Sequence, residues 1–365
     1  MINVQFFPSR RIAWYMARTF VVRSLAVLLA LVVVLQTLDL LGESGKILRV
    51  EGNGDSELWR YVGLRIPQLI SRFLPFSVLL GTLITLATLN QNSEIVSMKA
   101  AGISAHQIIA PLVVASLGIA AATFVFQERI VTRATSALND WQAVEYGPIP
   151  RDSGVSTNVW VRDGDDLIFA RTVSGRGAGT RLTDVRVYDR SGGVLVSLVE
   201  AGRARPQDGA WLLEEVETFD VSGTATRRLP SLRIAQGVEP DQFTLAKVNA
   251  DEQDFATLKS SIQDLKVAGR PTGPLEASLW HKISGPLSTV LMPLLAAVAA
   301  FGLARAGQLF LRAVFGMALG FAYFVADNFS LAMGNFGAYP PVLAAWAPFL
   351  LFLLIGETVL IRTEE

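Results

Sequence analysis

The residue types that most often carry catalysis are scarce in this chain. It has no cysteine, which excludes disulfides, thiolate nucleophiles and cysteine-ligated metal sites. Its two histidines, His106 and His281, stand near the ends of apolar segments, and neither an HExxH nor a GxSxG motif accompanies them. We therefore expect both histidines to pack at an interface, and we predict no catalytic centre and no metal site.

The segment GESGK at residues 42–46 has some of the letters of a phosphate-binding loop. A true P-loop needs four residues between its glycines and a Ser or Thr after the lysine, on a turn between a strand and a helix. Here Ile47 follows the lysine, and the segment comes at the end of an apolar run. The sequence therefore predicts no ATP-binding site in this chain.

One short polar segment, QNSEIVSMKAAGIS at residues 91–104, has the composition of a docking surface. Ser93 is a candidate helix cap, and the small residues Ala100, Ala101 and Gly102 permit close approach of another surface. The segment has too many small residues and too little basic charge for a good lipid anchor. We expect a short helix that docks onto another protein, with a helix lying on lipid as the alternative.

The histidines and the polar segments at 42–46 and 91–104 must be positioned by the apolar stretches beside them, which are long enough to cross a membrane. Of 365 residues, 51% are hydrophobic and 18% are charged, a balance too apolar for an ordinary soluble chain. A membrane span needs about 20 apolar helical residues. Six stretches qualify, at about 19–41, 66–89, 104–126, 279–303, 309–333 and 341–361. Because no small-residue cleavage site follows the first stretch, we expect a retained helix rather than a signal peptide.

The region between the first three spans and the last three has a different character. Residues 128–276 carry 18 Lys/Arg and 22 Asp/Glu, and their apolar pattern changes towards a period of two. Strands are expected at about 158–161, 166–173, 183–189, 194–200, 211–221 and 224–234, and a polar helix at 251–268. This spacing indicates an antiparallel sandwich or a jelly-roll-like sheet.

The sequence thus predicts a multi-pass α-helical membrane protein of six helices, three plus three, with an inserted all-β jelly-roll-like domain. The predicted parts are an N-terminal membrane half at 1–127, the β-domain at 128–276 and a C-terminal membrane half at 277–365. Lys and Arg in the short loops favour cytoplasmic termini and a β-domain on the outer side, although basic residues in the first outer loop, 42–65, count against it. Neither region is basic enough to indicate nucleic acid.

Several segments, in their order and spacing, resemble the LptF/LptG permease family of the lipopolysaccharide exporter of Gram-negative bacteria. They are SEIVSMKAAGIS at 93–104, NVWVRDGDDLIFARTV at 158–173, LWHKISGPLSTVLMPLLA at 279–296 and RAVFGMALGFAYFVADNF at 312–329, followed by GAYPP. Each string is moderately specific, and together they cover both membrane halves and the β-domain. The LWHKISGPLS and ADNF segments favour the LptG type of subunit, with its paralogue LptF as the alternative.

The resemblance implies a subunit of an ATP-binding-cassette transporter in the inner membrane, with cytoplasmic termini and a periplasmic β-domain. It implies a heterodimer with LptF, an LptB dimer that binds ATP and Mg, and a bridge through LptC to LptA, so this chain needs no cofactor of its own. The coupling helix that docks on LptB maps onto 91–104, with contacts at Glu94, Met98, Lys99, Ala100 and Gly102. The lateral gates map onto the first and fifth helices, with candidate acyl-chain contacts at Leu25, Leu28, Val32, Phe315, Leu319, Phe321 and Phe324.

Lipopolysaccharide carries phosphates as well as acyl chains, so its site needs a basic rim above an apolar wall. The candidate phosphate contacts near the expected rim are Lys46, Arg49, Arg65, Arg129 and Arg133, although each could equally be a surface or snorkelling residue. The first helix departs from the family, because Gln36, Gly42 and Glu43 stand where many relatives have basic residues. Lipid contacts would then be shifted along the loop or supplied by LptF.

Two functions outside transport stay open at this point. A membrane-anchored periplasmic sensor or scaffold is one, but it would usually need fewer spans. An intramembrane acyltransferase is the other, and the two isolated histidines argue against it.

Asp327 in the fifth span is costly inside a membrane unless it is paired or near the interface. A structural cap beside Asn328 is favoured there over a proton relay.

Overall fold

The computed structural model describes residues 9–148, 156–175, 177–191, 193–207, 209–221, 226–235, 238–240, 243, 248–267, 270–301 and 309–362. The chain forms two compact units. The helical unit consists of Met1–Pro148, Ala250–Lys259 and Thr272–Glu365, and the sheet unit consists of Ile149–Asn249 and Ser260–Pro271. The chain therefore passes from the helical unit to the sheet unit twice, first for residues 149–249 and again for residues 260–271.

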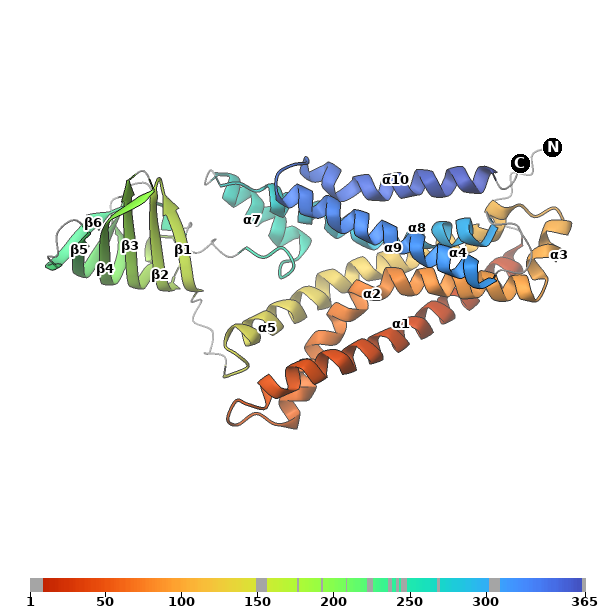
Figure 1. Cartoon of the computed structure of the whole chain (residues 1–365), viewed down its shortest axis with the longest axis horizontal. Coiled ribbons are helices and arrows are strands. Elements are labelled where there is room, and N and C mark those ends of the chain that lie inside the picture. Colours follow the sequence, from red (N-terminus) through yellow and green to blue (C-terminus); the bar gives the residue numbers. More distant parts are fainter. Residues whose placement is uncertain are drawn as a thin grey trace. The chain divides into compact units, whose positions relative to one another are not determined.

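Six helices of the helical unit are long and apolar enough to cross a membrane (Figure 1). They are α1 (Arg10–Ile47), α2 (Asp55–Gln91), α4 (Ala105–Phe126), α8 (Gly273–Phe301), α9 (Leu309–Asn335) and α10 (Pro341–Arg362). The predicted arrangement of three spans on each side of an inserted domain is confirmed. The residues between the fourth and fifth predicted spans, 304–308, lie outside the described part of the chain.

Some of these helices extend well beyond a bilayer. α1 has 38 residues and α2 has 37, so each is about 55 Å long, against a hydrocarbon core of about 30 Å. α4 continues through a π-helical turn, η1 (Gln127–Val131), into α5 (Thr132–Ala143). The sequence-based boundary at 128 therefore falls inside a helix, whereas the sheet unit begins at 149. A polar helical extension has no apolar run that would reveal it in the sequence.

Close approach of α1 and α2 fixes one side of the helical unit. A Cβ atom on Gly81 of α2 would lie only 2.7 Å from the Cα atom of Ser24 in α1, so a larger residue would force these helices apart. Arg23 Nη1 also donates a 3.0 Å hydrogen bond to the carbonyl oxygen of Ile84. The Arg23 guanidinium of α1 therefore has a hydrogen-bond acceptor on the backbone of α2 within an apolar span.

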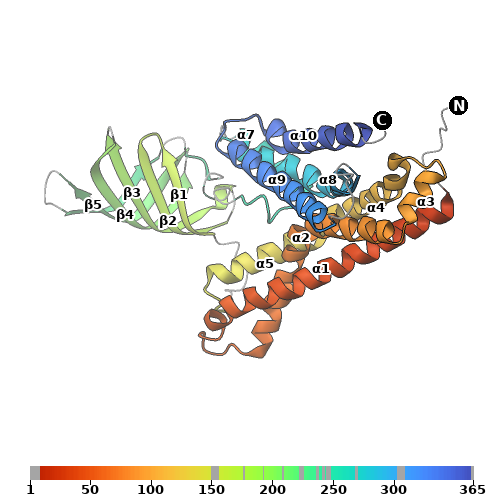
Figure 2. The ribbon, with the colours of Figure 1, turned by 45° about the vertical axis from the view of Figure 1, so that its right-hand side comes forward.

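The sheet unit is built on six antiparallel strands in which each strand pairs with the next along the chain (Figure 2). They are β1 (Ser156–Asp163), β2 (Asp166–Ser174), β3 (Arg181–Ser191), β4 (Val194–Gln207), β5 (Ala210–Asp220) and β6 (Thr226–Ile234), with a short 3₁₀ turn, η2 (Gly177–Gly179), before β3. The inserted antiparallel β-domain is confirmed, and its described strands form one meandering sheet rather than two. The polar helix expected at 251–268 is present as α7 (Phe255–Val267).

The two faces of this sheet differ in character. The buried face is apolar and includes Val159, Ile168, Val185, Val199 and Leu213. Trp211 belongs to the same core, and its Nε1 donates a 2.8 Å hydrogen bond to the carbonyl oxygen of Val238. The opposite face has exposed cross-strand ion pairs, such as Arg186–Glu200 at 2.8 Å. Exposed pairs of this kind add little stability, so the apolar face is what holds the sheet unit together.

Candidate functional site

A cavity of about 520 Å³ lies among α2, η1, α8 and α9 of the helical unit. Its lining has two layers. The polar layer includes Gln68, Arg72, His281, Lys282, Asp327 and Asn328. The apolar layer consists of Pro75, Phe76, Met292, Tyr323 and Phe324. The polar layer lies towards the start of α8 and the end of α9, and the apolar layer lies deeper along the same helices, so the cavity suits a molecule with one polar and one apolar end.

An imidazole–carboxylate pair crosses the polar layer. His281 Nε2 on α8 lies 3.0 Å from Asp327 Oδ2 on α9, and the Asp327 side chain is only 15% exposed. The expected cap at Asp327 is wrong, because α9 continues to Asn335 and the carboxylate contacts α8 instead. This partner is what makes a carboxylate tolerable within a membrane span.

A largely buried carboxylate joins three segments of the chain beside the cavity. Glu128 stands in the π-helical turn η1, and its Oε1 lies 3.6 Å from Lys282 Nζ on α8. Its Oε2 accepts a hydrogen bond from the Phe255 N–H at the start of α7. The Lys282 and Glu128 side chains are 13% and 16% exposed. Glu128 therefore links the helix that leads to the sheet unit with two segments that follow it, and π-helical turns of this kind are frequent at functional sites.

Aromatic rings form most of the apolar layer. Phe76 on α2 and Phe324 on α9 meet edge to face, with ring centroids 5.3 Å apart. Tyr323 meets Phe352 on α10 in the same way, also at 5.3 Å. Phe324 was predicted as an acyl-chain contact, and the structure places it on the wall of this cavity. The layer offers flat apolar surfaces against which a hydrocarbon chain can pack.

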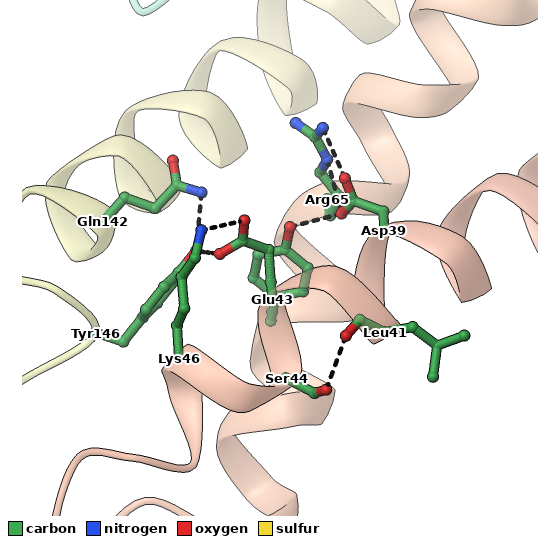
Figure 3. Close-up of polar contacts among 9 residues, drawn as sticks. Asp39, Leu41, Glu43, Ser44, Lys46, Arg65, Gln142 and Tyr146 are labelled. Atoms are coloured by element: carbon green, nitrogen blue, oxygen red, sulfur yellow. Dashed lines mark hydrogen bonds and ion pairs between the residues drawn. The ribbon is translucent and has the colours of Figure 1, made fainter.

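A second polar cluster joins the end of α1 to the first part of α2 (Figure 3). Asp39 accepts two hydrogen bonds from Arg65, from Nε at 3.2 Å and from Nη2 at 3.0 Å. Tyr61 Oη donates a third at 2.5 Å. Arg65 Nη1 donates to Gln68 Oε1 at 2.6 Å. Arg65, a predicted phosphate contact, is thus already engaged by a bidentate carboxylate.

The same cluster continues to the segment that follows α5 (Figure 3). Glu43 pairs with Lys46 at 2.8 Å and accepts a 2.8 Å hydrogen bond from Tyr146 Oη. Burial raises the pKa of Tyr146 to about 12, and the hydrogen bond to the Glu43 carboxylate acts in the same direction. The phenol therefore stays protonated and remains a donor at neutral pH. Lys46, another predicted phosphate contact, is also paired within the chain.

The other predicted phosphate contacts lie away from the cavity lining. Arg49, Arg129 and Arg133 are exposed, and none of them lines the cavity. Gln36, one of the positions at which the first helix departs from the family, is only 7% exposed and packs into the core. A basic rim made of these residues stays a prediction.

The predicted gate residues fall into two groups. Leu25, Phe315 and Phe321 are 54%, 52% and 59% exposed, so they are available to a lipid or to a partner helix. Leu28 and Val32 are 7% and 6% exposed and belong to the core, with Leu319 packed against it. The exposed residues of α1 and α9 therefore carry the gate prediction, whereas the buried ones position those helices.

The predicted coupling segment contains a short helix, α3 (Glu94–Ala100). Ile95 is buried and Met98 packs on the core, while Lys99, Ala100 and Gly102 are exposed. Ser93 precedes the helix in a left-handed conformation and makes no side-chain cap, so that expectation is wrong. Tyr15 Oη on α1 donates a 3.4 Å hydrogen bond to Glu94 Oε1. The small-residue surface is free of the core, and the helix that carries it contacts α1.

Sequence reasoning missed four residues that the structure brings to the cavity or its edge: Arg72, Glu128, Lys282 and the paired role of His281. A signal was available for Arg72, because a charge inside an apolar span is a functional indication by itself. Among the residues that the structure describes, no group of three His, Asp or Glu side chains is placed to hold a metal ion.

Six helices long and apolar enough to cross a membrane, together with an inserted antiparallel sheet, define a multi-pass membrane protein with an inserted β-domain. The chain belongs to the family described as lipopolysaccharide export system permease LptF/LptG, whose model matches residues 14–362. It is similar to lipopolysaccharide export system permease protein LptG of Escherichia coli strain K12, with 26% identity over 313 residues, 83% of this chain and 84% of the relative. It is also similar to LptG of Haemophilus influenzae, with 27% identity over 328 residues, 87% and 90% of the two chains.

The Glu128–Lys282 pair generates a stability prediction. Lys282→Met leaves the Glu128 carboxylate buried without a counter-charge, which should cost about 3 kcal/mol. Adding Glu128→Gln removes that charge and keeps an acceptor for the Phe255 N–H, so the double variant should recover most of the loss. Thermal unfolding of the purified protein checks this. Glu200→Gln, at an exposed pair in the sheet unit, serves as the control and should cost less than about 1 kcal/mol. A double variant as unstable as Lys282→Met would contradict the assignment.

Proposed function

We propose that this chain is the LptG-type permease subunit of an exporter that extracts lipopolysaccharide from the inner membrane and passes it to a periplasmic β-bridge. The observation that carries the proposal is the two-layered cavity. Its polar layer matches phosphates and sugars, and its apolar layer matches acyl chains. The similarity to two LptG proteins supports the LptG type over LptF.

The energy for transport is assigned to a partner ATPase, the LptB dimer, which would bind ATP and Mg. The GESGK segment forms the last turns of the helix α1 rather than a loop between a strand and a helix, which supports a chain without its own nucleotide site. The exposed small residues at the end of α3 are assigned to the contact with LptB. Because Tyr15 hydrogen-bonds to Glu94, movement of α3 would be transmitted to α1.

We assign the exposed sides of α1 and α9 to the contact with a helix of LptF. Both helices present large apolar side chains outward, including Leu29 at 67% exposed and Phe329 at 58%. Such a surface suits lipid or another helix. We assign the termini to the cytoplasm, supported by Arg10, Arg11 and Arg18 at the start of α1. The sheet unit then lies in the periplasm, where its apolar face would take up acyl chains on the way through LptC to LptA.

The coupling assignment predicts the effect of bulk on α3. Ala100 is exposed and has helical backbone, whereas Gly102 has φ of +83°, where any side chain is strained. Ala100→Trp should therefore block docking without distorting the chain, and co-purified LptB should fall at least tenfold while LptF stays bound. Ala122→Trp, at an exposed position of α4, is the matched control and should leave LptB bound. Normal LptB recovery and normal export with Ala100→Trp would refute the docking surface.

The proposed function predicts which face of α1 meets the substrate. A photo-reactive amino acid at Leu25, 54% exposed, should cross-link to lipopolysaccharide in membranes that contain the whole complex. The same group at Leu28, 7% exposed and one turn away, should react only with its own chain. If Leu25 captures no lipopolysaccharide in a complex that still exports it, the assignment of α1 to the gate fails.

A further inference from the structure

Arg72 of α2 lines the cavity and is exposed. It makes no hydrogen bond and no ion pair with any residue in the described part of the chain. Other cations around the cavity are engaged: Lys282 pairs with Glu128, and Arg65 pairs with Asp39. A guanidinium without a counter-charge is costly in a membrane span, so its retention points to a partner that binds there.

The depth of Arg72 along α2 indicates where that partner sits. Seventeen residues separate Arg72 from Leu89 at the other end of the apolar stretch, which is about 25 Å at helical rise. The hydrocarbon core is about 30 Å thick. Arg72 therefore lies just inside one boundary of the core, at the end of the bundle that holds the start of α8 and the end of α9. Its side chain can reach the level of phospholipid headgroups.

The surroundings of Arg72 restrict the chemistry of the partner. Asp327 is occupied by His281, and Asp251, the other carboxylate of the lining, makes contacts of its own. Neither is a free counter-ion for Arg72. One turn further along α2, Phe76 begins the apolar layer. A partner that suits both the Arg72 guanidinium and the apolar layer has two parts. One is an anionic group with several acceptor oxygens, and the other is a hydrocarbon chain attached close to it.

We propose that Arg72 anchors a phosphate group of an acylated amphiphile, with part of one acyl chain packed against the paired rings of Phe76 and Phe324. The site deepens the proposed function and rests on it, since it names the part of lipopolysaccharide that this cavity holds. A volume of about 520 Å³ takes a phosphate and part of one chain rather than a whole lipid with several chains. Guanidinium and phosphate pair through two parallel hydrogen bonds, which lysine cannot reproduce.

The test compares two probes on the complete transporter complex by native mass spectrometry. The probes are diphosphorylated lipid A and the same acylated disaccharide without phosphate. Wild-type complex should bind the phosphorylated probe at least tenfold more tightly. Arg72→Met should lose most of this preference without weakening the unphosphorylated probe, and Arg72→Lys should keep an intermediate preference. Arg11→Met, at an exposed position near the start of α1, is the matched control and should behave as wild type.

Each alternative outcome has a distinct meaning. If wild type binds neither probe, the proposed function fails together with the site. If Arg72→Met keeps the full preference, or weakens both probes equally, Arg72 is not the anchor while the transport function stands. Inorganic phosphate that displaced the lipid at millimolar concentration would show a site for free anions and overturn the amphiphile. Failure of both Arg72→Met and Arg72→Gln to assemble would show a structural role and overturn the proposal.

Discussion

A bilayer offers no hydrogen-bond partners, so polar groups inside the helical unit must satisfy one another. The structure obeys this rule at nearly every charged position along the spans. Arg23 donates to a backbone carbonyl of α2, and Asp327 lies against His281. Glu128 lies within ion-pair distance of Lys282. These contacts determine which faces of the helices meet, and they enclose a cavity whose polar layer is made largely of paired groups. Among the described cations of the cavity lining, Arg72 is the one without such a contact, and it gives the cavity a free positive charge.

The same contacts suggest how motion is transmitted through the chain. α3 touches α1 through Glu94 and Tyr15, and α1 is packed on α2 by the close approach at Gly81. α2 carries Arg72 and Phe76 into the cavity. A displacement of α3 by a docked ATPase would thus reach the cavity wall through two helix contacts. At the other end of the bundle, Glu128 connects η1 with α7 and α8, the segments on either side of the sheet unit in the sequence.

The sequence predicts the elements well because each rests on a local physical requirement. Twenty apolar residues without interruption indicate a membrane helix, and alternating β-formers between glycine turns indicate hairpin strands. The short helix α3 was recognised from its small residues, although Ser93 does not cap it as expected. The helix that runs from η1 into α5 was missed, because a polar helix outside the bilayer has no apolar pattern to distinguish it from the domain that follows.

The cavity could not be predicted in the same way, because it depends on pairs that are distant in the sequence. His281 and Asp327 are brought together by the packing of α8 on α9, and Glu128 and Lys282 by the approach of η1 to α8. Lys46 and Arg65 looked available for phosphate in the sequence, but neighbouring carboxylates occupy both. Three features of the cavity were visible in the sequence: the charges of Arg72 and Asp327 within apolar stretches, and Phe324 as an apolar contact.

The central claim is that the helical unit holds a phosphorylated, acylated lipid in its two-layered cavity. A cryo-electron microscopy structure of the complete complex, purified from membranes and supplied with lipopolysaccharide, tests it most directly. The account predicts phosphate density beside Arg72 and acyl-chain density against the paired rings of Phe76 and Phe324. A complex that holds lipopolysaccharide elsewhere, with this cavity closed or filled only by water, would contradict it.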